Sequence, residues 1–436
     1  MTTSQPVPKD ERVGRVRGVR TLLLAAGLSG LSSGILGVAN DLVAVLALGA
    51  GTEQIGALNA IESAAFVLLS VPMGWWLDRT DRRRALQWTQ VLATLALLSI
   101  PVAWWCGVLT FWQLAGTSFL VGTAGMVWNL GLGAMIPGLT GKARAAAAFS
   151  RKQAVETSAG LVAPGLTGLL LMVLAAPLAL FFAAVLELCA GLVLRWVPAP
   201  DGGAADGPVP DGAGPGSASE SRPRFWAGVG EGFRFVLKTK PLLVSTLNAA
   251  VLNAALALYA AVSTVYEVRV LGFTPAMIGA VGVAIAAGGL AGAVAGGWLL
   301  ERFRPVPLAA AMIAAAGAST VLVPLASLPA LAGGGAFAVL LVQSLIWNST
   351  VVIANAGLYG VLAQLTPDHL LGRVQSFRML VAMGPLPLFG LVGGFLGAAL
   401  GIIPTLWMYV GLALLAAVLT TFLWRMSVKE GWGSGA

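Results

Sequence analysis

The sequence predicts an all-α integral membrane protein that crosses the bilayer many times. Only 10% of its 436 residues are charged and 58% are hydrophobic. The mean hydropathy of +0.87 lies outside the range of soluble domains. Apolar runs of the roughly 20 residues that a helix needs to span the hydrocarbon core recur along the whole chain. A β-barrel is disfavoured, because its strands would alternate apolar and polar residues over short segments.

Hydropathy and helix-breaking residues divide the apolar part of the chain into twelve predicted helices. Their approximate ranges are 21–48, 54–77, 85–105, 109–136, 152–174, 177–197, 243–266, 275–300, 307–327, 332–362, 374–400 and 404–425. The first range is too long for the apolar core of a signal peptide, so we expect a transmembrane helix there. Gly288, Gly292 and Gly296 recur at four-residue spacing, which favours close packing against another helix.

The positive charges predict the orientation of these helices. Of the 26 Lys and Arg residues, only Arg269 falls on the outer side when the N-terminus is placed inside. Because cytoplasmic loops carry the excess of Lys and Arg, both termini are predicted to be cytoplasmic, in the cell inner (plasma) membrane. Glu267 and Arg269 are expected to be solvated in an outer loop.

A polar segment divides the helices into six plus six. It begins as a Gly-, Pro- and Asp-rich linker that cannot bury enough apolar surface to fold. It ends in a run of Phe, Val and Leu beside Arg and Lys, which predicts an amphipathic helix on the inner membrane surface. The predicted organisation is an N-terminal tail (1–20), a six-helix bundle (21–197), this segment (198–240), a second six-helix bundle (241–425) and a C-terminal tail (426–436).

The two halves carry an internal repeat. "GWWLDR" (74–79) matches "GWLLER" (297–302), and "VWNLGL" (127–132) matches "IWNSTV" (346–351). A third match joins "APGLTG", around Pro164, to "GPLPLFG", around Pro385. The three offsets are nearly equal and join corresponding helices, which indicates a duplicated six-helix unit. Parallel six-helix repeats are a known transporter architecture.

The loop after the second predicted helix resembles the signature of the major facilitator superfamily. That signature is a Gly, an Asp-Arg four residues later and then a basic cluster. The matching residues here are Gly74, Asp78, Arg79, Arg82, Arg83 and Arg84. Asp81 stands where the family usually has glycine, so the tight turn must be made differently. The second copy, Gly297, Glu301 and Arg302, has Glu in place of Asp.

Further stretches are similar to the bacterial drug-exporter branch of that superfamily, which includes macrolide and enterobactin exporters. They are "FVLLSVPMGWWLDR", "EGFRFVLKTKPLL" and "LTPDHLLGRVQSFRML". A degenerate form of the family's antiporter motif is present at Pro164 and Gly168. The resemblance implies a gate role for the loop motif, in which Asp78 faces the helix N-terminus near Gly372 and Arg373 and so joins the two halves.

Three acids inside apolar ranges are candidate proton-coupling residues: Asp41, Glu62 and Glu187. Ionisable groups in a bilayer are costly, so each needs a reason to be there. A carboxyl group shielded from water can load and release a proton near neutral pH. The alternative is a neutral carboxyl group hydrogen-bonded between helices or reached by outer water.

Amide and indole side chains form the predicted substrate cavity, because the resemblance implies that helices 1, 4 and 10 line it. The candidates are Asn40, Trp128, Asn129, Trp347 and Asn348. Such groups could hold a planar, uncharged polar molecule by stacking and hydrogen bonding. The alternative is helix packing by Trp and interhelical hydrogen bonds by Asn.

The sequence lacks the features that would indicate several other classes of protein. No cluster of His, Cys and carboxylates indicates a metal site, and the one histidine, His369, falls in a predicted cytoplasmic loop. The sequence contains no P-loop pattern, so ATP-driven transport is not indicated. It also shows no nucleophilic residue paired with a general base, which an enzyme of this kind would require. The net charge of +8 follows from the inner loops and does not indicate nucleic-acid binding.

These observations predict a secondary active efflux transporter without cofactors, driven by the proton gradient. The expected cargo is a small drug-like molecule or antibiotic, such as the amphenicol chloramphenicol or a macrolide, moved by proton antiport with alternating access. The alternative is proton-coupled uptake of a small metabolite. The expected partners are the cargo and the lipid bilayer, and the expected oligomeric state is a monomer.

Overall fold

The computed structural model describes residues 9–77, 79–140, 142–171, 173–197, 233–366 and 371–430, and these residues are overwhelmingly helical. The chain divides into two compact units. The first unit comprises Met1–Leu48 and Ala64–Gly207, and the second comprises Gly49–Ser63 and Pro208–Ala436. The boundary therefore falls inside one helix, whose first half belongs to the second unit.

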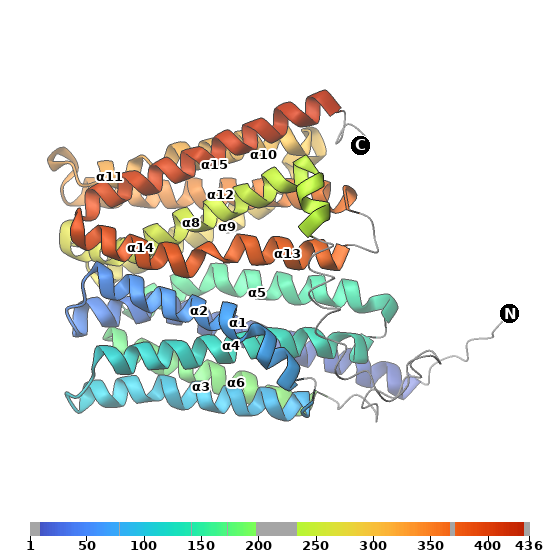
Figure 1. Cartoon of the computed structure of the whole chain (residues 1–436). Coiled ribbons are helices and arrows are strands. Elements are labelled where there is room, and N and C mark those ends of the chain that lie inside the picture. The colour runs from blue at the N-terminus through green and yellow to red at the C-terminus, as the bar shows by residue number, and fades with distance from the viewer. Residues whose placement is uncertain are drawn as a thin grey trace. The chain divides into compact units, whose positions relative to one another are not determined.

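The first unit is a bundle of long helices joined by short connections (Figure 1). Its elements are α1 (Lys9–Ala47), the later part of α2 (Thr52–Leu77), α3 (Arg82–Trp105), α4 (Phe111–Thr140), α5 (Lys142–Leu171), α6 (Ala176–Val193) and the 3₁₀ turn η1 (Leu194–Trp196). Helix α1 packs against α4, α5 and α6, and α3 packs against α4 and α6. A Cβ added at Gly30 would lie 2.9 Å from the Ala159 Cβ, so glycine permits the close approach of α1 to α5.

The second unit holds the first half of α2 and the helices after the linker. These are α8 (Lys240–Val265) with the π-helical turn η3 (Tyr266–Val270), α9 (Pro275–Arg302), α10 (Pro305–Ser319), α11 (Leu322–Leu325), η4 (Pro329–Leu331), α12 (Gly334–Gln364), α13 (Leu371–Met383), α14 (Pro385–Ala399) and α15 (Ile402–Glu430). The short helical stretch 233–238 packs Val236 against Leu242 and Val374.

Eleven helices in the described ranges are long and apolar enough to cross a membrane, against the twelve predicted. Helix α2 is not among these eleven, although it runs unbroken for 26 residues. The predicted helix 374–400 is divided at Gly384, because Pro385 has no N–H with which to continue the hydrogen-bond ladder. The predicted helix 307–327 is likewise divided into α10 and α11.

Glycine spacing permits a close helix pair in the second unit, as the sequence predicts. A Cβ at Gly288 of α9 would lie 2.7 Å from the Leu345 carbonyl oxygen of α12, and one at Gly292 would lie 2.5 Å from that of Ser349. Since backbone atoms cannot move aside, only glycine fits at these two positions. Helices α9 and α12 therefore pack backbone to backbone.

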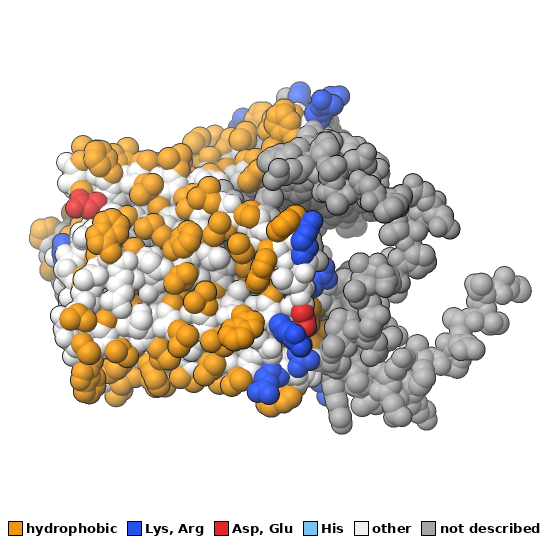
Figure 2. Space-filling model, turned by 60° about the horizontal axis from the view of Figure 1, so that its bottom comes forward, with side chains coloured by type: hydrophobic (Ala, Val, Ile, Leu, Met, Phe, Trp, Pro, Cys, Tyr) orange, Lys and Arg blue, Asp and Glu red, His pale blue; other side chains and the backbone are white. Residues whose placement is uncertain are grey.

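The surface is that of helices surrounded by lipid. Hydrophobic side chains cover much of the visible face, and most of the visible Lys and Arg side chains gather at one set of helix ends (Figure 2). Exposed aromatic residues such as Trp88, Trp105 and Trp112 are expected in such a setting, because lipid rather than water surrounds them.

The repeated segments adopt the same local structure in both units. The Arg79 guanidinium lies 3.9 Å from the ring centroid of Trp75, and that of Arg302 lies 4.2 Å from the ring centroid of Trp298. Asn129 and Asn348 each donate to the carbonyl four residues earlier. The structure therefore repeats locally where the sequence repeats.

Candidate functional site

A charged cluster lies between α4 and α5 in the first unit. The Lys152 Nζ lies 2.8 Å from both carboxylate oxygens of Glu156 and donates to the Asn129 Oδ1 at 3.2 Å. The Lys152 side chain is 3% exposed and that of Glu156 is 17% exposed, while Asn129 lies at the surface of the unit. These three residues form an accessible polar site built around a buried cation, and we call them the Lys152 cluster.

Only one member of the Lys152 cluster was predicted. Asn129 was a cavity candidate, whereas Lys152 and Glu156 fall at the start of the predicted helix 152–174 and were not among the site candidates. The structure begins α5 at Lys142, so both residues lie inside a helix. A Lys and a Glu four residues apart lie on one face of a helix, and this spacing was the signal that could have revealed the pair.

The other cavity candidates of the first unit lie in its interior. Trp128 is buried in the apolar core with Leu86 and Met135, and its Nε1 has no hydrogen-bond partner among the described residues. Asn40 is buried as well and donates to the Ser118 Oγ at 3.0 Å. Of the pair Trp128 and Asn129, only Asn129 is accessible.

Two of the three candidate proton-coupling acids, Glu187 and Asp41, lie apart from each other in the first unit. Glu187 is buried on α6 and accepts from the Ser29 Oγ of α1 at 3.3 Å. Asp41 is buried on α1, about 18 Å along the helix from Ser29 at 1.5 Å per residue. Glu62 is half-buried on the part of α2 that belongs to the second unit. Glu187 and Asp41 therefore have separate environments.

An uncharged aromatic cluster is the corresponding feature of the second unit. The rings of Tyr259 (α8) and Tyr409 (α15) stack with their centroids 4.9 Å apart, and Trp347 (α12) lies 6.1 Å from Tyr409. Trp347 and Tyr409 are buried, while Tyr259 is half-buried. Trp347 was predicted from its repeated Trp-Asn motif. The two tyrosines were not, since no motif marks them.

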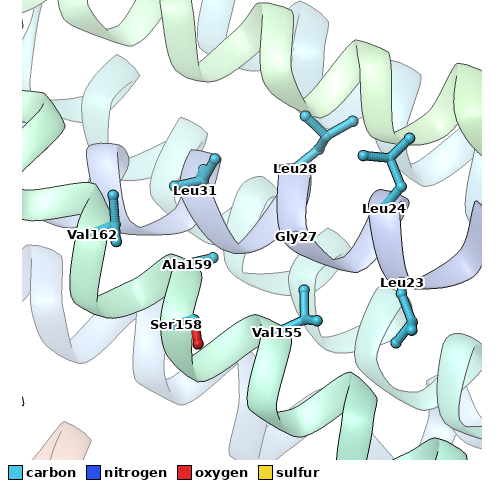
Figure 3. A pocket seen from close by; sticks show the side chains of 9 residues that line it. All are labelled: Leu23, Leu24, Gly27, Leu28, Leu31, Val155, Ser158, Ala159 and Val162. Carbon is cyan, nitrogen blue, oxygen red and sulfur yellow. The ribbon is translucent and has the colours of Figure 1, made fainter. Parts of the chain in front are cut away.

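A groove of about 520 Å³ runs between α1 and α5 in the first unit (Figure 3). Leucines of α1 form one wall, and Val155, Ala159 and Val162 of α5 form the other. Ser158 is the one lining residue with a polar side chain. The groove follows the same turns of α5 that carry Glu156, and its chemistry suits an apolar group.

The expectation of solvation is wrong for Glu267, whereas Arg269 is exposed as expected. Helix α8 continues as the π-helical turn η3, which leaves Glu267 only 7% exposed. The Arg269 guanidinium donates to the carbonyl oxygens of Gly49 and Ala50 at 2.7 Å each. Arg269 thus binds the backbone that leads into α2, and Glu267 forms no ion pair within the described ranges.

Glycines also bring α14 close to the first half of α2. Thr52 donates to the Gly394 carbonyl oxygen at 3.1 Å. A Cβ at Gly394 would lie 2.7 Å from the Thr52 carbonyl oxygen and 3.0 Å from the Gly56 Cα. This contact and that of Arg269 lie at the end of the second unit that the charge pattern predicts to face outside.

The structure describes only part of the loop motif that follows α2. Asp78 lies outside the described residues, as do the side chains at positions 372 and 373, so the contact predicted between them stays a prediction. Asp81 makes the turn that glycine usually makes: its carboxylate caps α3 by accepting from the backbone N–H groups of Arg83 and Arg84. Its φ of −61° is ordinary for any residue.

The remaining motif residues have local roles. Arg82 donates to the Ala134 carbonyl oxygen, and Arg83 donates to that of Arg195. A Cβ at Gly74 or Gly297 would meet no atom within 4 Å, and Glu301 is exposed. Pro164 and Gly168 both lie inside α5, where the Thr167 hydroxyl donates to the Ala163 carbonyl oxygen at 2.8 Å.

Metal-ligating residues are sparse in the part of the chain that the structure describes. No group of three or more His, Cys, Asp or Glu side chains there could hold a metal ion. His369 lies outside the described residues. The two cysteines, Cys106 and Cys189, are free thiols.

Two repeated units of long apolar helices, with isolated polar clusters among them, define a multi-pass membrane transporter. The profile of the Major Facilitator Superfamily matches residues 22–385, and the chain belongs to that family. Members of this family are generally transporters rather than enzymes. No protein of curated function matches the chain.

Solved structures share the fold. A bacterial homologue of the iron transporter ferroportin in an inward-facing state is 17% identical, with a TM-score of 0.69 over 94% of this chain and 98% of that one. A bacterial homologue of the human lysosomal transporter Spinster is 15% identical, with a TM-score of 0.64 over 98% and 99%. The nucleoside transporter NupG is 12% identical, with a TM-score of 0.68 over 94% and 99%. At such identities the likeness concerns the fold alone.

Proposed function

We propose that the protein exports a small, uncharged or weakly basic drug-like molecule across the plasma membrane in exchange for protons. The observation that carries this proposal is the chemistry of two clusters, one in each unit, that reach the surface of the unit through Tyr259 and Asn129 respectively. One presents aromatic rings without charge, and the other presents a neutralised ion pair with an amide. An aromatic molecule with a few hydrogen-bonding groups suits both surfaces.

The groove between α1 and α5 supports a cargo with a largely apolar body. Its walls are hydrocarbon, and it would receive the apolar part of an amphipathic molecule. An amphenicol such as chloramphenicol has this character, and a macrolide is the second candidate. The resemblance of the loop motif and linker region to drug exporters supports outward transport.

A secondary transporter of this kind needs no cofactor, because the proton gradient supplies the free energy. Asp41, Glu62 and Glu187 are the coupling residues proposed from sequence, and the burial of Asp41 and Glu187 supports a role that involves loss and gain of a proton. We propose that the protein works as a monomer in the lipid bilayer.

A drug-resistance profile in a hypersusceptible bacterial host tests the proposal. Cells that express the protein should accumulate less of at least one aromatic antibiotic, and a protonophore should abolish the difference. Unchanged accumulation across a broad panel would refute export. If the chain instead imports a metabolite, expressing cells would accumulate more of a labelled compound, and the protonophore would reduce that accumulation.

A further inference from the structure

The groove between α1 and α5 is apolar along its length and lies between two helices that run in the same direction. Gly27 of α1 lies against Val155 of α5, and Gly34, further along α1, lies against Ala163. Because Gly27 has no side chain, space is left between the larger side chains of the two walls (Figure 3). The groove follows α1 from residue 23 to residue 31, about 12 Å at 1.5 Å per residue. A hydrocarbon-lined groove of this length suits an extended alkyl chain.

Two arginines, Arg20 and Arg151, lie at one end of this groove. Arg20 stands four residues before Leu24 of the α1 wall, and Arg151 stands four residues before Val155 of the α5 wall. Because residues four apart share a face of a helix, each arginine continues the groove-lining face of its own helix. Both residues are exposed. Since the two helices run in the same direction, both cations lie at the same end of the groove.

That end coincides with the edge of the apolar part of both helices. The apolar span of α1 begins at Gly18 and that of α5 begins at Ala154, so Arg20 and Arg151 each lie within three residues of a span boundary. The charge pattern predicts that this edge faces the cytoplasm. The two cations therefore stand at the level of lipid headgroups, and the groove lies at the level of the acyl chains.

Neither arginine is neutralised by a carboxylate among the residues that the structure describes. The acid nearest in sequence to Arg151 is Glu156, and it is paired with Lys152 at 2.8 Å. Lys152 in turn donates to Asn129 of α4, so that ion pair is directed toward α4. The positive charge of the two arginines is thus available to an anion that comes from the membrane.

We propose that this groove is a binding site for an anionic phospholipid of the cytoplasmic leaflet. One acyl chain lies in the groove, and the phosphate accepts hydrogen bonds from the guanidinium groups of Arg20 and Arg151. Guanidinium groups suit phosphate because they donate two parallel hydrogen bonds. Basic pockets between transmembrane helices on the cytoplasmic side are a recognised form of lipid site. The inference is independent of the proposed export, and a cargo that uses the groove must displace this chain.

Photolabelling of the purified wild-type protein in phosphatidylcholine nanodiscs locates the lipid. The probe is phosphatidylglycerol with a diazirine in one acyl chain, and mass spectrometry of peptides maps the adducts. Adducts should concentrate on residues 23–31 and 155–162, and unlabelled phosphatidylglycerol should suppress them. Adducts spread evenly over the exposed faces of α3 and α6 would overturn the inference. No drug is present, so the result is decided whether or not the protein exports one.

The arginines are tested by the affinity for phosphatidylglycerol, measured by native mass spectrometry of the delipidated full-length protein. Each arginine near a membrane surface strengthens the binding of anionic lipid about fivefold, so Arg20→Gln with Arg151→Gln should weaken it about 25-fold. Phosphatidylethanolamine with the same acyl chains should bind more weakly to the wild type and change little in this variant. An unchanged preference for phosphatidylglycerol in the variant would overturn the inference.

Two controls separate a lipid site from general surface charge. Arg195→Gln with Arg304→Gln removes two exposed arginines away from the groove and should leave the affinity within about twofold of the wild type. An equal loss in this control would overturn the inference. Glycerol phosphate, which has no acyl chain, should bind far more weakly than phosphatidylglycerol, and equal binding would show a site for a free anion instead of a lipid.

The groove itself is tested by filling it. Val162 is an exposed wall residue, and Val162→Trp should lower the affinity for phosphatidylglycerol at least about fivefold, because fewer methylene groups of the chain are then buried. Leu169→Trp is the matched control, since Leu169 is exposed on the same face of α5 but lies beyond the groove. Wild-type affinity in a folded Val162→Trp protein would contradict the assigned place of the acyl chain. The wild-type photolabelling stays decisive should either variant not fold.

Discussion

Individual charged and polar residues in the apolar helices are held by partners on neighbouring helices. Glu187 on α6 has Ser29 of α1, Lys152 has Asn129 of α4, and Arg269 has two backbone carbonyl groups. Candidate residues such as Asn129 and Glu187 could be predicted because a lone polar residue in an apolar range is conspicuous. Their partners could not, because pairing between helices depends on how the helices pack.

Asp81 gives a direct test at the residue scale. Asp81→Ala removes the acceptor for two N–H groups at the start of α3, so the free energy of unfolding should fall by about 1 kcal/mol. Asp81→Asn is the matched control, because Asn caps helices about as well. Denaturation of the purified protein in detergent measures both variants, and an Ala variant as stable as the wild type would contradict the capping role.

Tyr259 tests the aromatic cluster in the same way. Its half-buried ring stacks on Tyr409, and an aromatic contact is worth about 0.5–1.5 kcal/mol. Tyr259→Ala should therefore weaken chloramphenicol binding about two- to tenfold, whereas Tyr259→Phe should keep it. Equilibrium binding to the purified protein measures the effect. Equal affinities for the Ala and Phe variants would remove this ring from the cargo site.

At the scale of elements, the positions of helices follow from hydropathy, but their ends and breaks do not. The predicted helix 243–266 stops where α8 in fact continues through η3, and this continuation buries Glu267. The division at Gly384 could be inferred from Pro385, since proline is a known helix breaker, but proline inside α2, α3 and α5 breaks nothing. Packing decides which proline interrupts a helix.

The contact of α14 with the first half of α2 is sensitive to side-chain size. In Gly394→Val, the new Cβ would lie 2.7 Å from the Thr52 carbonyl oxygen, and neither backbone can move aside. We expect a lower thermal stability and a loss of transport. Gly411→Ala on α15 meets no atom within 4 Å and should be neutral. Melting of both variants in detergent tests this, and equal stability would show that the two helices tolerate separation.

At the scale of the whole molecule, the internal duplication could be predicted from the sequence. The paired motifs 74–79 and 297–302 each stack an Arg on a Trp, and the family match over residues 22–385 agrees with the transporter architecture inferred from them. The identity of the cargo could not be predicted from the sequence, because it depends on which side chains remain accessible after the helices pack. The Lys152 cluster and the Tyr259 ring became apparent only in the folded units.

The central claim is exchange of a drug-like molecule for protons, and the direction of the pH gradient tests it most directly. Labelled chloramphenicol is added to the external medium of proteoliposomes whose interior is acidic. An exchanger should accumulate the drug as protons leave, and nigericin, which dissipates the pH gradient, should abolish the accumulation. Accumulation only when the liposomes are acidic outside would mean co-transport with protons and would contradict the account.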